Sequence, residues 1–364
     1  MTQRSDLRIA VLPGDGIGVE VMDVCLQVLD ALAARLGGFR FSWNRLPGGA
    51  GEYRRTGNAF SDESMKEVAR ADAILFGAMG LPDVRYPDGT EIAPQLDIRM
   101  ALELYAGVRP IRAIPGLPGP LRDPRAAEID FVVLREQTEG LYHSRGRGTV
   151  EDDTARDTML ITRAGCERVF DYAFRLARRR RARGRPGKVA CVDKAGVLQS
   201  FAFMRRVFLE RAKAHPDIDS ECANIDATAL NLVLKPWSFD VMVTENMFGD
   251  ILSDLGAALV GGMGVAPSGD IGDKHGLFQP CHGTAPDIAG SGKANPTAMF
   301  LSAAMMLEWL GERHGDRRLL EAARVLDEAV RGAFKGAGVR PFEFGGAHGT
   351  RAIADAVLER VAAP

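Results

Sequence analysis

Short apolar runs alternate with longer segments of helical periodicity along almost the whole chain. The runs that we expect to form buried strands are residues 8–12, 39–44, 73–76, 130–135, 188–192 and 240–244. The segments that we expect to form helices are residues 19–36, 62–70, 162–183, 200–215, 296–310, 317–334 and 350–361. Apolar residues three and four apart indicate a helix with one buried face, and short apolar runs between such helices indicate strands. The alternation therefore predicts a layered α/β fold.

The size and charge of the chain limit what it can bind. Its 364 residues allow two domains of ordinary size, and a Pro/Gly-rich segment at 115–124 is a natural place for the chain to pass between them. The 46 basic and 48 acidic residues give a net charge of −2, which offers nucleic acid no general attraction. The arginine run at 178–181 has no interleaved aromatic residues, so we expect it to be a solvated face. No stretch is apolar enough for a membrane span. We expect neither a nucleic acid nor a membrane as partner.

The cysteines indicate the redox environment of the protein. The chain has five, scattered along the sequence and without a C-x-x-C pair. This pattern argues against a disulfide framework and against a structural zinc site, and it favours a reducing, cytoplasmic location.

A glycine-rich loop follows the first predicted strand. Its sequence, Gly14-Asp15-Gly16-Ile17-Gly18, lies where a dinucleotide-binding fingerprint would lie. The spacing is G-x-G-x-G, however, and no acidic residue ends a second strand about 20 residues further on. A Rossmann site is therefore disfavoured. The loop is either a turn that approaches a cofactor or simply a tight strand-to-helix turn.

Two carboxylates occur four residues apart beside the apolar stripe of one predicted helix. Asp250 and Asp254 lie on one face of the segment FGDILSDL, residues 248–255. Acids held this close in a partly desolvated site repel each other unless a cation joins them, and hard oxygen ligands suit Mg²⁺ or Mn²⁺. Acids near a helix N-terminus are also favoured by the helix dipole without any metal. The spacing alone leaves both interpretations open.

Three arginines are candidates for binding an anionic acid. Arg109 precedes a proline, Arg135 closes an apolar strand, where a charge needs a partner, and Arg99 is the third. Guanidiniums that converge on one site clamp a dicarboxylate, although each alone is more often a surface or ion-pairing arginine. Tyr142 and Lys194 are candidate proton-transfer groups, the lysine only if its ammonium is desolvated. A lone lysine after a strand is otherwise usually solvated.

The segment 282–290 combines glycines with one histidine and one acid. Asp287 is a candidate acceptor for hydrogen bonds from an adenosine ribose, the role of an acid in NAD-selective sites. The alternative is a structural loop. A nucleophilic role for Cys281 beside His282 is disfavoured, because adjacent residues rarely point at each other.

Six of these segments together resemble the isocitrate and isopropylmalate dehydrogenase family of metal-dependent β-decarboxylating dehydrogenases. They are LPGDGIGVEV (12–21), IRMALELYAGVRP (98–110), VLREQTEGLY (133–142), VDKAGVLQ (192–199), ENMFGDILSDL (245–255) and HGTAPDIAG (282–290) through Asn295-Pro296. They follow the family's order across nearly the whole chain. The resemblance implies a two-domain, non-Rossmann α/β fold of the isopropylmalate dehydrogenase type, with mixed sheets flanked by helices. Residues 1–104 and 261–364 would form a large, cofactor-side domain, and residues 105–260 a smaller domain for dimerisation and the metal site.

The resemblance also implies roles for individual residues. The substrate clamp would be Arg99, Arg109 and Arg135, the proton-transfer residues Tyr142 and Lys194, and the ligands of Mg²⁺ or Mn²⁺ Asp226, Asp250 and Asp254. In the family, the residues at the positions of Lys194 and Asp226 reach across a dimer interface into the partner's site. The resemblance therefore implies an obligate homodimer.

A nucleotide cofactor is implied as well. Its site would comprise His282, Gly283, Thr284, Ala285, Pro286, Asp287, Ile288 and Asn295. NADP-using relatives carry a lysine-tyrosine pair at the positions of Asp287 and Ile288. An acid there repels a 2′-phosphate, so NAD is the expected cofactor.

The substrate is read, in this family, by residues just before Arg99. Isopropylmalate enzymes present leucines there and isocitrate enzymes a serine and an asparagine, whereas this chain has IAPQL at 92–96. Gln95, next to Leu96, makes a branched alkyl group less favourable, because a buried amide needs polar partners. The segments REQTEGLY and SRGRG are more similar to the tartrate, malate and homoisocitrate members. We expect NAD-dependent oxidative decarboxylation of D-malate or a tartrate-like acid. The alternatives are 3-isopropylmalate, then isocitrate or homoisocitrate, and a non-catalytic homologue.

Overall fold

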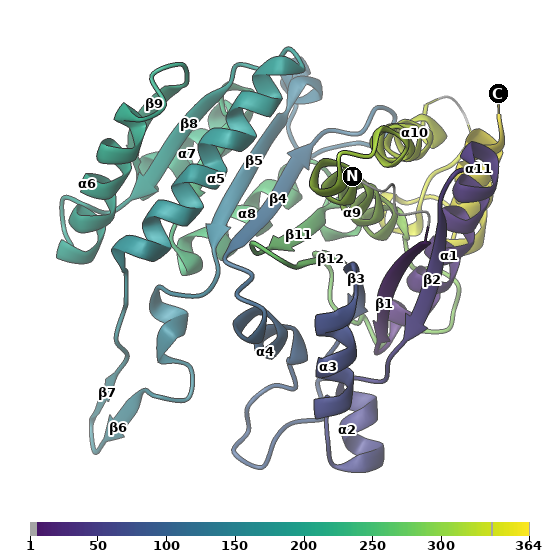
Figure 1. Cartoon of the computed structure of the whole chain (residues 1–364), viewed down its shortest axis with the longest axis horizontal. Coiled ribbons are helices and arrows are strands. Elements are labelled where there is room, and N and C mark those ends of the chain that lie inside the picture. Colours follow the sequence, from purple (N-terminus) through teal and green to yellow (C-terminus); the bar gives the residue numbers. More distant parts are fainter. Residues whose placement is uncertain (1–5, 336–337, 364) are drawn as a thin grey trace. The chain divides into compact units, whose positions relative to one another are not determined.

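The computed structural model describes residues 6–335 and 338–363 (Figure 1). The chain divides into two compact units. Unit 1 comprises Met1–Leu102, Ile114–Gly119 and Gly261–Pro364, and unit 2 comprises Glu103–Ala113 and Pro120–Val260. Both are mixed α/β structures, so the predicted fold class is confirmed. That one unit binds the cofactor and the other makes a dimer stays a prediction. In the described part of the chain, no helix has the length and apolar character needed to cross a bilayer.

Unit 1 is built on strands that are mostly parallel. Their order is β2 (Arg40–Arg45), β1 (Asp6–Gly14), β3 (Ala73–Ala78), β12 (Gly276–Pro280) and β11 (Pro267–Ile271), and β11 is antiparallel to β12. The helices are α1 (Ile17–Leu36), α2 (Ala50–Thr56), α3 (Asp62–Arg70), α4 (Pro94–Ala101), α9 (Thr297–His314), α10 (Arg317–Ala333) and α11 (Thr350–Ala362). Helix α1 packs on β3 and α9 on β11 and β12, which buries the apolar strand residues.

Unit 2 has a second mostly parallel set of strands. Their order is β4 (Ala106–Arg112), β5 (Asp130–Glu136), β10 (Val241–Thr244), β8 (Lys188–Asp193) and β9 (Asp219–Asn224), and β4 is antiparallel to β5. The helices are α5 (Arg163–Ala182), α6 (Gln199–Lys213), α7 (Ile225–Leu234) and α8 (Asn246–Leu259). A small hairpin of β6 (Thr149–Glu151) and β7 (Thr154–Arg156) extends away from the other strands of this unit (Figure 1).

Helices α8 and α5 pack on opposite faces of β5. Gly249 of α8 lies against Arg135, and a Cβ added at this glycine would come within 2.7 Å of the arginine's Cβ. Arg168 of α5 lies 3.7 Å from the carboxylate of Glu136, the next residue of the strand. Neighbouring strand residues point to opposite faces, so each helix covers one of them. The face under α8 carries the candidate site.

The glycine-rich loop is a tight turn that hydrogen bonds hold to neighbouring segments. The carboxylate of Asp15 accepts backbone hydrogen bonds from Ala50, Gly51 and Gly80 at 2.7, 2.8 and 2.9 Å. Gly16 has a φ of 55°, and a Cβ there would lie 2.1 Å from the carbonyl oxygen of Thr284. The loop therefore needs glycine for close backbone approach, and Asp15 ties it to the N-terminus of α2.

The arginine run at 178–181 differs from the prediction. Arg178 forms an ion pair with Asp217 at 2.7 Å on the surface. The side chain of Arg180, by contrast, is only 13% exposed and pairs with Asp130 at 3.0 Å and Asp240 at 2.5 Å. The expected solvated face is wrong for Arg180. Acids that are distant in sequence supply its partners, which no local pattern reveals.

Candidate active site

Strands β4 and β5 present two of the predicted arginines on one face. In their antiparallel register Gly107 lies opposite Arg135, and Arg109 lies opposite Val133. Opposed residues point to the same side, so Arg109 and Arg135 share the face that α8 covers. Both guanidiniums are buried. A buried cation requires anionic or polar partners, and α8 provides them for Arg135.

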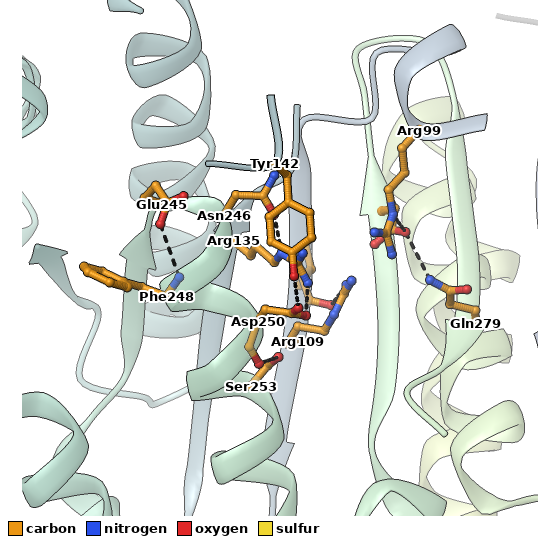
Figure 2. A network of polar contacts seen from close by, with 12 residues as sticks. Arg99, Arg109, Arg135, Tyr142, Glu245, Asn246, Phe248, Asp250, Ser253 and Gln279 are labelled. Carbon is orange, nitrogen blue, oxygen red and sulfur yellow. Dashed lines mark hydrogen bonds and ion pairs between the residues drawn. The ribbon is translucent and has the colours of Figure 1, made fainter. Parts of the chain in front are cut away.

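Helix α8 holds Arg135 with two side chains one turn apart. The Nε of Arg135 donates to Asn246 Oδ1 at 2.8 Å, and its Nη1 forms an ion pair with Asp250 (Figure 2). The amide of Asn246 in turn donates to the carbonyl oxygen of Glu139 at 2.9 Å. Residues four apart lie on one face of a helix, so this spacing aims both groups at the guanidinium. Asn246 was not singled out from the sequence, although it lies one turn before Asp250.

Tyr142 joins the same group. It lies in the short 3₁₀ turn Leu141–Ser144, and its hydroxyl donates to Asp250 Oδ2 at 2.7 Å. The guanidinium of Arg135 lies 5.2 Å from the centre of the tyrosine ring, and the two side chains meet at Asp250 in Figure 2. Partial burial, followed by the bond to Asp250, raises the pKa of Tyr142. The phenol therefore keeps its proton beside a half-exposed carboxylate.

Asp254 follows Asp250 by one helical turn, and the charge of Asp250 contributes to the pKa shift of Asp254. Desolvation, and then repulsion from Asp250, raise the pKa of Asp254, whereas Arg109 and Arg135 act in the opposite direction. Two oxygen-donor acids that repel each other are the kind of donor set that a divalent cation relieves. In a single chain, however, the described residues gather no group of three acids, histidines or cysteines fit to hold a metal. Asp226 does not complete such a group with Asp250 and Asp254.

Lys194 and Asp226 are instead brought to each other. Strands β8 and β9 are parallel neighbours with Asp193 opposite Asn224, so the segments that follow them leave the same end of the strands. The ammonium of Lys194 forms an ion pair with Asp226 Oδ2 there. The Asp226 side chain is 69% exposed, which leaves it free to contact something beyond this pair.

Arg99 lies in unit 1, where Asp270 holds its guanidinium and Gln279 holds Asp270; neither residue was foreseen from the sequence. Its Nε donates to Asp270 Oδ2 at 2.8 Å, and Gln279 donates to the same oxygen at 3.2 Å (Figure 2). Asp270 is completely buried in β11, where an acid requires a cationic partner. An acid inside a short buried strand is the signal that could have revealed it. The convergence of Arg99 with Arg109 and Arg135 stays a prediction.

Gln95 and Leu96 begin helix α4 a turn before Arg99. Both side chains are partly buried. The Oε1 atom of Gln95 is buried and has no hydrogen-bond partner among the described residues. Such an acceptor is a candidate contact for a polar ligand group.

The segment 282–290 is anchored at one residue and exposed around it. Thr284 donates from its hydroxyl to Gly80 O at 2.7 Å and accepts the backbone N–H of Ile17 at 2.8 Å. Gly283, Pro286 and Asp287 are exposed, and Ala285 and Ile288 are half-buried. Backbone groups of an exposed, well-anchored loop suit contacts to a nucleotide.

His282 and Asn295 differ in whether their polar side-chain atoms are available for a cofactor contact. Burial lowers the pKa of His282, and its Nε2 is buried with no hydrogen-bond partner among the residues described. This orphaned ring nitrogen fits a cofactor contact. Asn295 accepts from the backbone N–H and hydroxyl of Thr297 and donates to Glu343 at 2.5 Å. Both ends of its amide are thus occupied by Thr297 and Glu343, and a cofactor contact from Asn295 stays a prediction.

Comparison with known proteins identifies the relatives of this chain. A family profile described as isocitrate/isopropylmalate dehydrogenase matches residues 8–357. A 3-isopropylmalate/3-methylmalate dehydrogenase of Methanocaldococcus jannaschii is 41% identical over 97% of this chain and 98% of its own length. A probable tartrate dehydrogenase/decarboxylase of Agrobacterium vitis is 36% identical over 98% of each chain. The crystal structure of isocitrate dehydrogenase from Methylococcus capsulatus superposes with a TM-score of 0.85 at 35% identity, covering 98% of this chain and 99% of that one. The chain therefore belongs to the isocitrate/isopropylmalate dehydrogenase family and is an enzyme of the decarboxylating-dehydrogenase type.

Proposed function

We propose that the protein catalyses the NAD-dependent oxidative decarboxylation of a malate-type 2-hydroxy acid, D-malate or a tartrate-like acid, with Mg²⁺ or Mn²⁺. The observation that carries the proposal is the contact of Arg135 and Tyr142 with the two oxygens of one carboxylate, Asp250. A cation for the substrate, a proton donor and a hard oxygen ligand are thereby held together. These are the groups that such a reaction needs.

The arginines bind the substrate in this proposal. Arg109 and Arg135, on one face of β4 and β5, donate to its carboxylates, and Arg99 completes the clamp. Asn246 and Asp250 fix the guanidinium of Arg135, so little side-chain freedom is lost on binding. Asp270 fixes Arg99 in the same way.

Two residues move protons. Lys194, as the neutral amine, takes the proton of the substrate hydroxyl while hydride passes from the carbon that bears this hydroxyl to NAD, and Asp226 stabilises the ammonium that forms. Tyr142 gives its proton to the carbon that loses carbon dioxide. Its raised pKa suits this role, because the phenol stays protonated until the proton is needed.

Asp250 and Asp254 would hold the divalent ion together with Asp226 of a second copy of the chain, and their mutual repulsion supports this assignment. The bound ion supplies Lewis acidity at the substrate hydroxyl, and NAD supplies the hydride acceptor. The cofactor would lie along residues 282–288 and Asn295. Asp287 is exposed there, and its charge disfavours the 2′-phosphate of NADP.

A homodimer is part of the proposal. Apolar side chains are exposed along the loop after β8 and along α7 and α8, namely Val197, Leu198, Leu230, Val233, Leu234 and Ile251. They flank Lys194, Asp226 and Asp250 in the sequence. An exposed apolar surface of this kind favours association with another protein surface. A second copy of the chain would cover it and would also supply Asp226 as the third metal ligand.

The five free cysteines support a reducing, cytoplasmic location.

The first candidate substrates, D-malate and a tartrate, carry no alkyl group on the malate core. The unpartnered Oε1 of Gln95 favours a ligand with a hydrogen-bond donor over an alkyl group. 3-Isopropylmalate is the second candidate, because a relative named 3-isopropylmalate/3-methylmalate dehydrogenase is 41% identical and the tartrate relative 36%.

A substrate panel tests the proposal. D-malate, the tartrate isomers, 3-isopropylmalate, isocitrate and homoisocitrate are each supplied with NAD or NADP and Mn²⁺, and NADH or NADPH formation is followed by absorbance. We expect turnover with D-malate or a tartrate, NAD above NADP, and loss of activity with EDTA that Mn²⁺ restores. Turnover of 3-isopropylmalate alone would select the second candidate.

A further inference from the structure

Gln137 is buried beside the candidate site with an unsatisfied amide. Its side chain is 5% exposed, and neither Oε1 nor Nε2 has a hydrogen-bond partner among the described residues. Burying both the donor and the acceptor of an amide without partners disfavours folding, so such a group calls for a functional or ligand-related reason. The roles proposed above for the site do not use it.

The position of Gln137 places its amide among the substrate-binding groups. Its backbone N–H donates to Tyr105 O at 3.0 Å and continues the β4–β5 ladder by one residue. A Cβ added at Gly107 would lie 2.5 Å from both Cδ and Nε2 of Gln137, so the amide lies directly over this glycine. Gly107 is opposite Arg135 and two residues from Arg109. The amide of Gln137 is therefore on the same face of β4 and β5 as Arg109 and Arg135. Its side chain is as buried as those of the two arginines.

The chemistry of an amide identifies the group that it would recognise. A carboxamide offers donors and an acceptor together, and an alcohol is a small neutral group that both accepts and donates. A branched alkyl group would leave the amide without partners. We propose that Gln137 is a specificity-determining residue that hydrogen-bonds a hydroxyl on carbon 3 of the substrate, so that a tartrate is preferred to D-malate and to 3-alkylmalates. This inference rests on the proposed function and narrows it.

Gln137→Leu tests the inference by removing the amide while keeping most of the volume. The measured quantity is the ratio of kcat/KM for the best tartrate isomer to kcat/KM for D-malate, which lacks the 3-hydroxyl. We expect this ratio to fall by about tenfold or more, because a site built to bond a hydroxyl discriminates strongly in its favour. The melting temperature of the variant should not fall, since an unsatisfied polar group is replaced by an apolar one.

Gly107→Ala provides a second test that leaves the amide present but displaced. Its new methyl group would collide with the amide, so this variant should lower the same ratio. In a Gln137→Ala background the collision is gone, and adding Gly107→Ala should change the ratio no further. This non-additivity is the signature of an effect that passes through Gln137.

The possible results separate the inference from the proposed function. If the wild type oxidises a tartrate but its ratio to D-malate is unchanged in Gln137→Leu, or if it prefers 3-isopropylmalate, the inference is overturned and the reaction class stands. An equal loss on all substrates would show a structural role and also overturn it. If the wild type oxidises no malate-type acid, the proposed function itself fails and the inference falls with it.

Discussion

Asp250 is the residue at which the charges of the candidate site meet. One of its oxygens pairs with Arg135, the other accepts from Tyr142, and its charge adds to the desolvation that raises the pKa of Asp254. The carboxylate therefore binds a guanidinium and a phenol while its charge repels the carboxylate of Asp254. Such a group serves both as an orienter of side chains and as a ligand for a cation, and its neutralisation affects all three neighbours.

Asp250→Asn should reduce metal-dependent turnover by at least about a hundredfold, because the amide removes the charge that holds Arg135 and binds the ion. Steady-state kinetics at saturating Mn²⁺ would measure the loss. Far-UV circular dichroism should be unchanged, since Asp250 is partly exposed and its loss leaves no cavity. Activity equal to the wild type would remove Asp250 from the metal site.

Asp287→Lys should shift the nucleotide preference. The residue is exposed, so the exchange should leave the fold intact while replacing a repulsive charge by an attractive one for a 2′-phosphate. We expect the ratio of kcat/KM for NADP to that for NAD to rise by about tenfold or more. Asp287→Asn is the matched control and should give a smaller rise. The same ratio in all three proteins would place the nucleotide elsewhere.

Single residues were predictable from the sequence only where a motif carries them. Asp250, Tyr142 and Arg135 lie in recognisable segments, and the structure joins them. Asp270 was not foreseen, because its partner Arg99 is 171 positions away. The amide of Gln137 was missed for the same reason: only the folded β4–β5 pair shows that it lies over Gly107.

At the scale of elements, Asp15 joins the first strand-to-helix turn to α2. Asp15→Ala removes three backbone hydrogen bonds to one carboxylate and leaves the N–H of buried Ala50 without a partner. We expect a loss of about 2–4 kcal/mol in unfolding free energy, measured by urea denaturation. Ser61→Ala, which removes the ordinary N-cap of α3, is the control and should cost about 1 kcal/mol. A smaller loss for Asp15→Ala than for the control would contradict the structural role.

The turn after β5 gives a prediction about pH. Burial raises the pKa of Glu136 above its ordinary value of 4.5, although bonds from Thr138 and Glu139 act against the shift. The folded protein thus holds this proton to higher pH than the unfolded chain, so the contribution of Glu136 to stability declines as pH rises above 4.5. The melting temperature of Glu136→Gln minus that of the wild type should therefore increase between about pH 4 and pH 8.

Glu210→Gln is the matched control, and its sign is opposite. Arg163 lowers the pKa of Glu210, so the wild type gains stability as pH rises through the acid range. The difference between this variant and the wild type should become more negative over the same range. A pH-independent difference for Glu136→Gln would show that its carboxyl is not desolvated.

The elements themselves were predictable where local and tertiary signals agree. Helix α3 spans the expected residues, and Ser61 caps its N-terminus. Thr162, the predicted first residue of α5, is the N-cap of that helix. Strands β11 and β4 were not predicted. Every residue of β11 is buried although it contains Pro, Ser, Gly and Asp, and β4 carries Arg109-Pro110. In both, neighbouring elements impose strand structure on sequences with weak strand propensity.

At the scale of the whole molecule, the candidate metal site is incomplete in one chain. Asp250 and Asp254 lie on α8, whereas Asp226 is paired with Lys194 at the ends of β8 and β9. The described residues of a single chain gather no third ligand for the α8 acids. In the proposed dimer, a second copy of the chain would bring its own Lys194 and Asp226 to this site, with the exposed apolar side chains of α7 and α8 at the interface.

Subunit complementation is the most direct measurement of this sharing. Asp226→Asn and Asp250→Asn are purified separately, mixed in equal amounts under conditions that exchange subunits, and assayed with Mn²⁺, NAD and the best substrate. A mixed dimer would carry both substitutions in one site and neither in the other. Each variant alone should be inactive, and the mixture should recover about a quarter of wild-type activity, since half of the randomly formed dimers contain one intact site. A mixture no more active than its separate components would contradict a site shared between two chains.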